Sequence, residues 1–261
     1  KTDKDLEILN KNFNSMISRL KNQQEKLIIT EKHEAWGSLA RKLAHEIKNP
    51  LTPIQLTIDR IKNKFSNDLS TNNQRDFKNN LKIIDNQIKQ IEKLVNEFSD
   101  FARMPKPVMK KNDLVILLKD TIDLLKELDK SIIIQFNKNK KNIELNSDPE
   151  QLSRVFFNLI KNSIESIHQK LEKGPDFNKK ISIELNDFDD HISLVIYDNG
   201  IGFEVSKNNI KDILNPYFTT KKKGTGLGLS IVNKIVNDHN GNIKFTNIVD
   251  GAKIEVIFSK K

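Results

Sequence analysis

Hydrophobic residues recur at alternating steps of three and four over the first hundred positions, which is the spacing of helices that bury one face. Two such stretches run through residues 39–65 and 77–101, and the turn-forming sequence SNDLSTNN at 66–73 separates them. We therefore expect an antiparallel helical hairpin over residues 35–107, preceded by a heptad-like coiled-coil helix over residues 1–34. A lone hairpin leaves an apolar seam bare, so we expect a second copy to complete a four-helix bundle.

The pattern changes after PKP at 105–107, a stiff linker that predicts a domain boundary. Residues 108–261 alternate strand-like apolar runs with amphipathic helices, and helix starts are marked by Asn112 or Asp113 and by Asp148. The expected elements are helices ending near residues 128, 171 and 238, a short helix at 204–214, strands at 131–136, 142–145, 181–185 and 191–197, and a final hairpin turning at Asp250 and Gly251. The predicted fold class is α plus α+β, a helical hairpin followed by helices layered on a mixed sheet.

Composition narrows the function classes. The 261-residue chain has no cysteine, which excludes disulfides and thiolate metal sites. No run reaches the roughly 18 apolar residues of a membrane span, and the chain opens on Lys1, so we expect a fragment of a longer protein with a membrane anchor upstream. The net charge is +9, but only six of the 44 basic residues are Arg and no aromatic-basic stripe appears, so we expect no nucleic-acid partner.

The first candidate site is the helix LARKLAHEIKNPLTPIQL at 39–56. Helical geometry directs its apolar stripe to one side and His45 to the other. Asn49 and Thr52 share this outer face, and Glu46 lies at its edge. Two prolines just beyond remove backbone donors and loosen the helix. Because polar helix faces are usually just solvated, this pattern alone does not establish a site.

Two further motifs carry polar groups suited to a nucleotide. Asn158 and Asn162 lie four apart in NLIKN, so their amides can offer oxygens to a hydrated cation and donors to phosphate. In DNGIGF, Asp198 ends an apolar strand, where its carboxylate can accept a hydrogen bond from the amine of a base. Gly200 and Gly202 then allow close approach of ligand and backbone. Each motif alone is more often a solvated pair or a simple turn.

The third motif, PYFTTKKKGTGLGLSIV, has glycines alternating at a helix start, where open amide donors face phosphates. Three lysines and three threonines, at 221–223 and at 219, 220 and 225, add cations and hydroxyls. The motif departs from a dinucleotide fingerprint in spacing and lacks a preceding strand, and it lacks the Gly-Lys-Ser/Thr ending of a P-loop. It therefore indicates a nucleotide site of another kind.

The order HEIKNP, NLIKN, DNGIG, PYFTTK and GTGLGL resembles the histidine, asparagine, glycine and phenylalanine boxes of bacterial sensor histidine kinases. Within them, AWGSLARKLAHEIKNPLTPIQL and EFSDFARMPKPVM resemble the NtrY-type nitrogen-regulation kinases, and the first thirty residues resemble the last helix of a HAMP module. The resemblance implies three domains: a signalling coil at 1–34, a dimerisation and histidine-phosphotransfer domain at 35–107, and a Bergerat-type (GHKL) ATP-binding domain at 108–261.

The resemblance also implies roles. His45 is the expected phosphoacceptor with Glu46 as its base, and Asn49 and Thr52 position a water that dephosphorylates the partner. Asn162 is the expected Mg²⁺ ligand and Asp198 the adenine reader. The residues expected to contact ATP are Asn158, Asn162, Asp198, Gly200, Gly202, Phe218, Thr219, Thr220, Lys221, Gly224, Thr225, Gly226, Leu227 and Gly228. The implied protein is a homodimer at the inner membrane, with its kinase part in the cytoplasm, that phosphorylates an NtrX-like response-regulator receiver domain.

Two other functions share these motifs. Gyrase-like and chaperone ATPases have the same nucleotide fold, but they usually carry a water-activating Glu at the position that is Asn158 here. A dimeric scaffold without catalysis is the other alternative, although no nucleotide motif is visibly broken. Two departures from the kinase pattern are Ser163 in place of the usual Ala and a short lid between Pro216 and Gly224.

Overall fold

The computed structural model shows the chain as two compact units, Lys1–Met104 and Pro105–Lys261. The residues that it describes are Phe13, Met16, 43–44, 46–64, 71–102, 104–174, 177–203, 207–216, 218–221 and 224–260. His45 and nearly all of the coiled coil predicted over residues 1–34 lie outside this set. Among the helices so described, none combines the length and the apolar character that crossing a bilayer requires.

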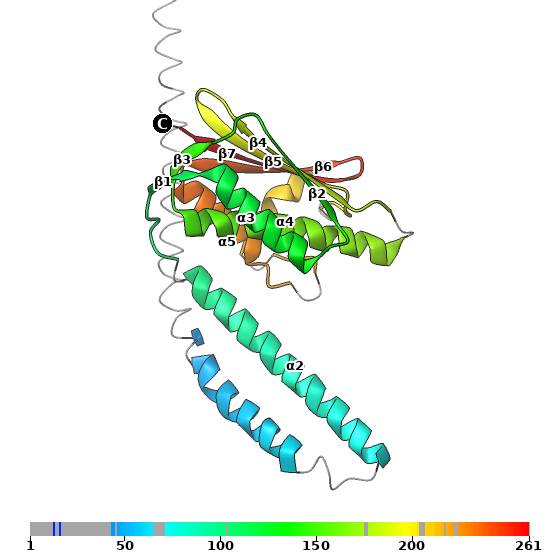
Figure 1. The fold of residues 1–261 in the computed structure, drawn as a ribbon. Coiled ribbons are helices and arrows are strands. Elements are labelled where there is room, and N and C mark those ends of the chain that lie inside the picture. The colour runs from blue at the N-terminus through cyan, green and yellow to red at the C-terminus, as the bar shows by residue number, and fades with distance from the viewer. Residues whose placement is uncertain are drawn as a thin grey trace, which may run out of the picture. The chain divides into compact units, whose positions relative to one another are not determined.

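The first unit contains two antiparallel helices, as the sequence predicted (Figure 1). Residues 46–64 are helical through both prolines, and α2 spans Thr71–Ala102. The buried residues of their shared core are spaced by seven on each helix: Leu51, Ile58, Leu81 and Ile88. Seven residues are close to two helical turns, so each pair lies on one side of its helix and meets the other pair.

A second apolar stripe on each helix remains partly exposed. Ile47 and Ile54, again seven apart, are 39% and 45% exposed. On α2, Ile84, Ile91 and Leu94 are 44%, 40% and 40% exposed. Two apolar positions per heptad, of which the hairpin itself buries only one, are typical of helices that pack against further helices.

The second unit is a layer of three helices on one face of a five-stranded sheet (Figure 1). The helices are α3 (Leu114–Leu128), α4 (Pro149–Lys173) and α5 (Gly228–Asp238). The strands are β2 (Ile133–Lys138), β4 (Lys180–Asp187), β5 (His191–Asp198), β6 (Gly241–Ile248) and β7 (Gly251–Ser259). Their order is β2-β4-β5-β7-β6, with β2 parallel to β4 and the other neighbours antiparallel, which confirms the predicted mixed sheet.

The core lies between this sheet and the helices. Alternate strand residues point into it because successive side chains of a strand face opposite sides. The fully buried strand residues of β4, β5 and β7 are Ile181, Ile183, Leu185, Ile192, Leu194, Ile196, Val256 and Phe258. From α4 come Leu152, Val155, Phe156, Leu159, Ile160 and Ile167, all 0% exposed. α4 is therefore held against the sheet along most of its length.

Asp148 fixes the start of α4. Its carboxylate accepts hydrogen bonds from the backbone N–H groups of Glu150 (3.0 Å), Gln151 (3.1 Å) and Val108 (2.8 Å). Burial raises the pKa of Asp148, but these three N–H donors outweigh it, so the pKa lies below the ordinary value. The predicted N-cap is confirmed, and it also ties residue 108, just beyond the PKP sequence, to the start of α4.

The structure adds to, refines or corrects the local predictions at three points. β1 (Lys110–Asp113), which the sequence analysis did not predict, pairs antiparallel with β3 (Glu144–Ser147). The short helix near 204–214 is a 3-10 helix, η1 (Lys207–Leu214). The last hairpin turns one residue earlier than predicted, at 249–250, and Gly251 opens β7 with φ +110°. A Cβ on Gly251 would lie 1.9 Å from the carbonyl oxygen of Asp198, so only glycine fits there.

Candidate nucleotide-binding site

The two asparagines of α4 face the loops that precede α5. Asn158 donates from Nδ2 to the carbonyl oxygen of Arg154 (2.9 Å), and a Cβ on Gly228 would lie 3.4 Å from its Oδ1. The Oδ1 atom of Asn162 accepts a hydrogen bond from Nζ of Lys221 at 3.1 Å. Residues about 60 positions apart in the chain thus meet along one face of α4, as the predicted site requires.

Asp198 lies at the carboxyl end of β5 and is only 3% exposed. One carboxylate oxygen accepts the backbone N–H of Gly200 at 3.0 Å. Burial raises the pKa of Asp198, and the N–H groups of Gly200 and Ala252, the nearby Ser163 hydroxyl and the Lys170 ammonium only partly oppose it. The Ser163 hydroxyl is itself buried without an aligned hydrogen bond. Because Ser163 stands in place of the Ala that is usual in histidine kinases, it adds one more polar group beside this carboxylate.

The turn after Asp198 is held from two sides. On one side, the N–H of Ile201 donates to Oγ of Ser166 at 3.1 Å, and a Cβ on Gly200 would lie 2.2 Å from that same oxygen. On the other, the side-chain amide of Asn247 accepts the N–H of Phe203 (2.7 Å) and donates to its carbonyl (2.9 Å). Gly202 between them has φ +73°, a conformation that favours glycine. The turn is therefore fixed by contacts as well as by its glycines.

The described residues of the loop before α5 lie close to one another. The N–H of Lys221 donates to Oγ1 of Thr219 (3.1 Å), and the N–H of Gly224 donates to the carbonyl of Lys221 (3.1 Å). A Cβ on Gly224 would lie 2.4 Å from Oγ1 of Thr219, and Gly226 has φ +69°. α5 then begins without a side-chain cap. Its first N–H groups are the kind of donors that bind phosphate at a helix start.

The structure brings the predicted nucleotide residues together around α4. Lys221 contacts Asn162 of α4, and Gly228 lies beside Asn158 of the same helix. Asp198 and Gly200 contact residues 163–166 of α4. The other predicted contacts, which belong to the same loops, are Gly202, Phe218, Thr219, Thr220, Gly224, Thr225, Gly226 and Leu227. Glu46, Asn49 and Thr52 belong to the first unit and are all exposed.

Sequence reasoning missed several residues that shape the site. Ser166 lies one turn beyond Asn162 on α4, and that spacing could have identified it. Lys170 donates to the carbonyl of Asn199 at 2.9 Å and forms an ion pair with Asp250. Asn247 comes from β6, and no motif in the sequence connects it with Phe203. These side chains hold the turn that follows Asp198.

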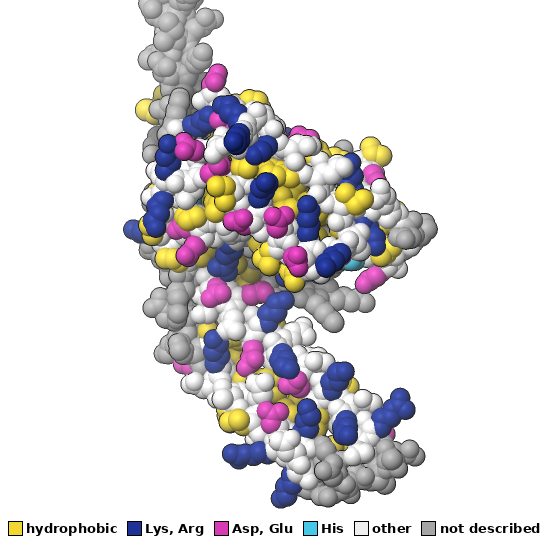
Figure 2. Space-filling model, viewed as in Figure 1, with side chains coloured by type: hydrophobic (Ala, Val, Ile, Leu, Met, Phe, Trp, Pro, Cys, Tyr) yellow, Lys and Arg dark blue, Asp and Glu magenta, His cyan; other side chains and the backbone are white. Residues whose placement is uncertain are grey.

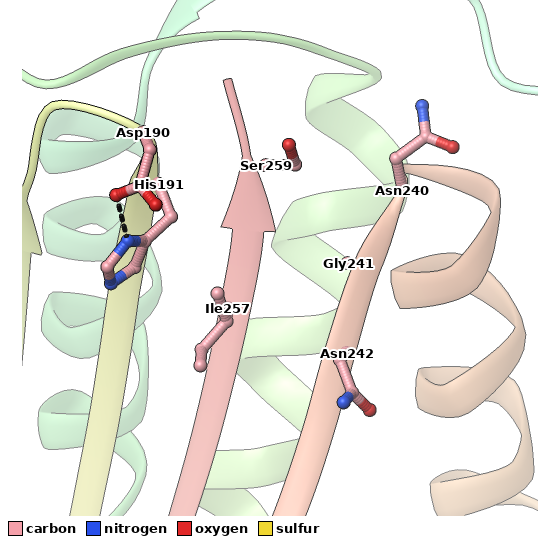
Figure 3. Close-up of a pocket in the computed structure, with 7 residues that line it drawn as sticks. All are labelled: Asp190, His191, Asn240, Gly241, Asn242, Ile257 and Ser259. Carbon is pink, nitrogen blue, oxygen red and sulfur yellow. Dashed lines mark hydrogen bonds and ion pairs between the residues drawn. The ribbon is translucent and has the colours of Figure 1, made fainter. Parts of the chain in front are cut away.

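Two of the hollows formed by the described residues lie in the second unit. One, of about 460 Å³, lies beside the turn and is lined by Gly200, Asn247 and Gly251 among others. The other, of about 310 Å³, is shown in Figure 3 at the ends of β5, β6 and β7, where Nδ1 of His191 pairs with Asp190 at 2.6 Å. This second hollow contains no residue of the predicted site, so it is not a candidate for the nucleotide.

The oxygen atoms that could bind a magnesium ion beside Asn162 are its own Oδ1 and the Glu165 carboxylate, both of which contact Nζ of Lys221. Mg²⁺ prefers oxygen ligands and usually keeps waters and substrate phosphates in its shell, so one amide oxygen can suffice from the protein. In the described part of the chain, no three His, Cys, Asp or Glu side chains form a cluster for a metal ion. A metal held here would therefore depend on the nucleotide for most of its remaining ligands.

Comparison with known families agrees with this geometry. Residues 35–107 match the His Kinase A (phospho-acceptor) domain, and residues 147–261 match the histidine kinase-, DNA gyrase B- and HSP90-like ATPase family. The second description also covers gyrase and chaperone ATPases, but the phospho-acceptor domain separates this chain from them. The chain belongs to the sensor histidine kinases.

Within that family, the relatives it is similar to include NtrY-like proteins. It is 39% identical over 250 residues to a putative NtrY-like sensor histidine kinase of Rickettsia prowazekii, covering 95% of this chain and 40% of the relative. It is 35% identical to the nitrogen regulation protein NtrY of Azorhizobium caulinodans, covering 86% of this chain and 28% of that protein. The chain thus spans about two fifths or less of the length of these curated relatives.

A solved structure shows the same two-part organisation. The histidine kinase ThkA, in complex with the response regulator TrrA, matches with a TM-score of 0.61 and 25% identity. The match covers 88% of this chain and 64% of ThkA. The match therefore extends over both the helical hairpin and the ATPase unit of this chain.

The contact between Gly200 and α4 gives a stability prediction. Gly200→Ala forces its Cβ onto Ser166, including the backbone carbon at 2.7 Å, so we expect a loss of about 1–3 kcal/mol in the free energy of unfolding. Gly174→Ala is the control, because its Cβ would meet only the Lys170 carbonyl oxygen at 3.8 Å. Denaturant unfolding of both variants measures the difference, and equal midpoints would contradict the packing described.

Proposed function

We propose that this chain transfers the γ-phosphoryl group of Mg-ATP to His45 and then to an aspartate of a response-regulator receiver domain. The observation that carries the proposal is the convergence on α4 of Asn162, Asp198 and the glycine loop, in a chain that also has a phospho-acceptor domain. The complex of ThkA with its response regulator supports the second step. An NtrX-like regulator is the proposed partner, because the chain is similar to NtrY proteins.

The nucleotide would lie along α4. Asp198, buried and oriented by the N–H of Gly200, is suited to accept a hydrogen bond from the amine of adenine. The open N–H groups at the start of α5 and the Lys221 ammonium would bind phosphates. Asn162, with Asn158 beside it, would hold Mg²⁺, which neutralises phosphate charge when it is bound.

At His45, a ring nitrogen forms a bond to the γ-phosphorus while the bond to the bridging oxygen breaks and ADP leaves. An unperturbed histidine has a pKa of about 6.5, so neutral imidazole is abundant at pH 7. Glu46, next in the chain and exposed, would take or orient the other ring proton. The protein contributes mainly positioning and charge neutralisation, as in other phosphoryl transfers.

The half-exposed stripe of the first unit supports a homodimer. Ile47, Ile54, Ile84 and Ile91, each 39–45% exposed, continue the heptad pattern beyond the hairpin's own core. We propose that a second copy covers this stripe and forms a four-helix bundle. The proposed domains remain 1–34, 35–107 and 108–261, with a membrane anchor upstream of a cytoplasmic kinase part.

A phosphatase activity toward the regulator is a separate proposal. It rests on Glu46, Asn49 and Thr52, which are all exposed within two helical turns. Their carboxylate, amide and hydroxyl groups suit a water that attacks the aspartyl phosphate of the partner. The proposal does not require the nucleotide loops to move.

His45→Ala should abolish labelling by γ-labelled ATP, because the accepting nitrogen is gone. The matched control is His191→Ala, which removes an imidazole from the hollow in the second unit and should leave labelling unchanged. Autoradiography after acid and base treatment distinguishes phosphohistidine from other products. Persistent label on the His45→Ala chain, or steady ADP release without any phosphohistidine, would favour an ATP-driven machine instead.

Binding of ADP should separate the roles of Asp198 and Asn162. Asp198→Asn should weaken binding by roughly tenfold or more with or without Mg²⁺, since a hydrogen bond to a charged acceptor is worth about 1.5–3 kcal/mol. Asn162→Ala should weaken it only when Mg²⁺ is present. Titration calorimetry in Mg²⁺ and in EDTA measures both, and a metal-dependent effect of Asp198→Asn would contradict the assignment.

The raised pKa of Asp198 adds a pH dependence to the same measurement. Amine recognition needs the ionised carboxylate, so affinity should fall on acidification at a higher pH than for an ordinary aspartate.

Thr52→Ala and Asn49→Ala should slow the loss of label from a phosphorylated regulator while autophosphorylation continues, because both residues act only on the attacking water. Thr57→Ala is the matched control, since Thr57 is also exposed on this helix and bonds back to the Pro53 carbonyl at 2.7 Å. Time courses of dephosphorylation decide the question. Rates equal to those of the parent would remove the support for a phosphatase role.

A further inference from the structure

Glu165 forms an ion pair with Lys221, which also contacts Asn162, the proposed Mg²⁺ ligand. Its carboxylate on α4 pairs with Nζ of Lys221, and the same Nζ donates to Oδ1 of Asn162 at 3.1 Å. Lys161, the other cation beside Glu165, lies 3.9 Å away on the same helix. The Lys221 ammonium therefore bridges two α4 side chains, one of which is the proposed Mg²⁺ ligand.

Backbone hydrogen bonds of Lys221 connect this contact to Gly224, the first glycine of the glycine-rich motif. The N–H of Lys221 is bonded to Thr219, and its carbonyl accepts the N–H of Gly224. Gly224 in turn packs against Thr219 so closely that a side chain would overlap with it. Where Lys221 sits thus determines where Gly224 sits, and with it the amides that face the phosphates.

Charge explains why the lysine needs a partner here. Lys221 and Glu165 side chains are 27% and 40% exposed, so their attraction is partly screened by solvent. A pair of this exposure shifts a loop equilibrium by a few-fold, not by orders of magnitude. Without Lys221, the Glu165 carboxylate would face incoming phosphates uncompensated and repel them.

We propose that Glu165 is a positioning residue of the nucleotide site: it holds Lys221 beside Asn162 and so fixes residues 218–221 and Gly224 of the loop before α5 against α4. This proposal rests on the proposed function, because it assigns that loop to phosphate binding. Glu165 itself acts only through Lys221. Among the described residues, Glu165 and Lys221 form the only ion pair between this loop and α4.

Hydrogen exchange of the full, nucleotide-free chain tests the loop directly. Glu165→Gln should speed exchange of the Lys221 and Gly224 amides about two- to fivefold, and the exchange should match that of Lys221→Met. Glu172→Gln is the matched control, with the same change on an exposed residue two turns further along α4. Unchanged exchange in Glu165→Gln, or an equal increase in Glu172→Gln, would overturn the proposal.

A double-mutant cycle on nucleotide affinity tests the coupling. The dissociation constant of a non-hydrolysable ATP analogue in Mg²⁺ is measured for Glu165→Gln, Lys221→Met and the double variant. If the two residues act as one unit, the double variant should bind no more weakly than Lys221→Met, because neutralising Glu165 also removes its repulsion. Losses that multiply in the double variant would contradict the proposal.

The two experiments distinguish failure of this proposal from failure of the proposed function. The hydrogen-exchange experiment contains no nucleotide, so it decides whether Glu165 fixes the loop even if the chain never phosphorylates His45. Failure of every variant and of the parent to bind the analogue would refute the proposed function and the role in phosphate binding together. Faster exchange without any change in affinity would also overturn the role in the nucleotide site.

Discussion

The burial of α4 against the sheet is the constraint on which the nucleotide site depends. Six of its apolar side chains are fully buried, so the helix can neither rotate nor slide without opening the core. Its remaining face must then present Asn158, Asn162, Glu165 and Ser166 to the loops. The site is therefore assembled from loops that rest on one rigid element.

The two ends of the site differ in dielectric environment. Asp198 is almost fully buried, and desolvation there makes ionisation costly and a well-oriented hydrogen-bond donor valuable. Lys221 and Glu165 remain partly exposed, so their charges are partly screened by solvent. This contrast suits the proposed recognition of the base by Asp198 and of the phosphates by Lys221. On the visible face, Figure 2 shows Lys and Arg interspersed with Asp and Glu, so local pairs matter more than a one-sign field.

In the first unit, by contrast, the hairpin leaves part of its apolar surface unpacked. Its hairpin buries one apolar stripe, centred on Leu51, Ile58, Leu81 and Ile88, and leaves a second one about 40% exposed. Glu46, Asn49 and Thr52 are exposed as well. A surface with both an apolar stripe and an exposed polar face is consistent with the proposed homodimer, because a second copy can cover the apolar stripe and leave the polar face exposed.

Periodicity and end signals determined most of the architecture, because helix spacing, alternating strands and the Asp113 and Asp148 caps are local properties. The sequence also placed Asn162, Asp198 and the glycines in motifs whose order indicated the family. It did not predict β1, the contacts of Asn247 or the link between Glu165 and Lys221. Those depend on which distant segments meet, as when a residue of β6 reaches Phe203, and no local pattern encodes that partner. Only the tertiary structure decided them, since sheet order and the position of α4 set those distances.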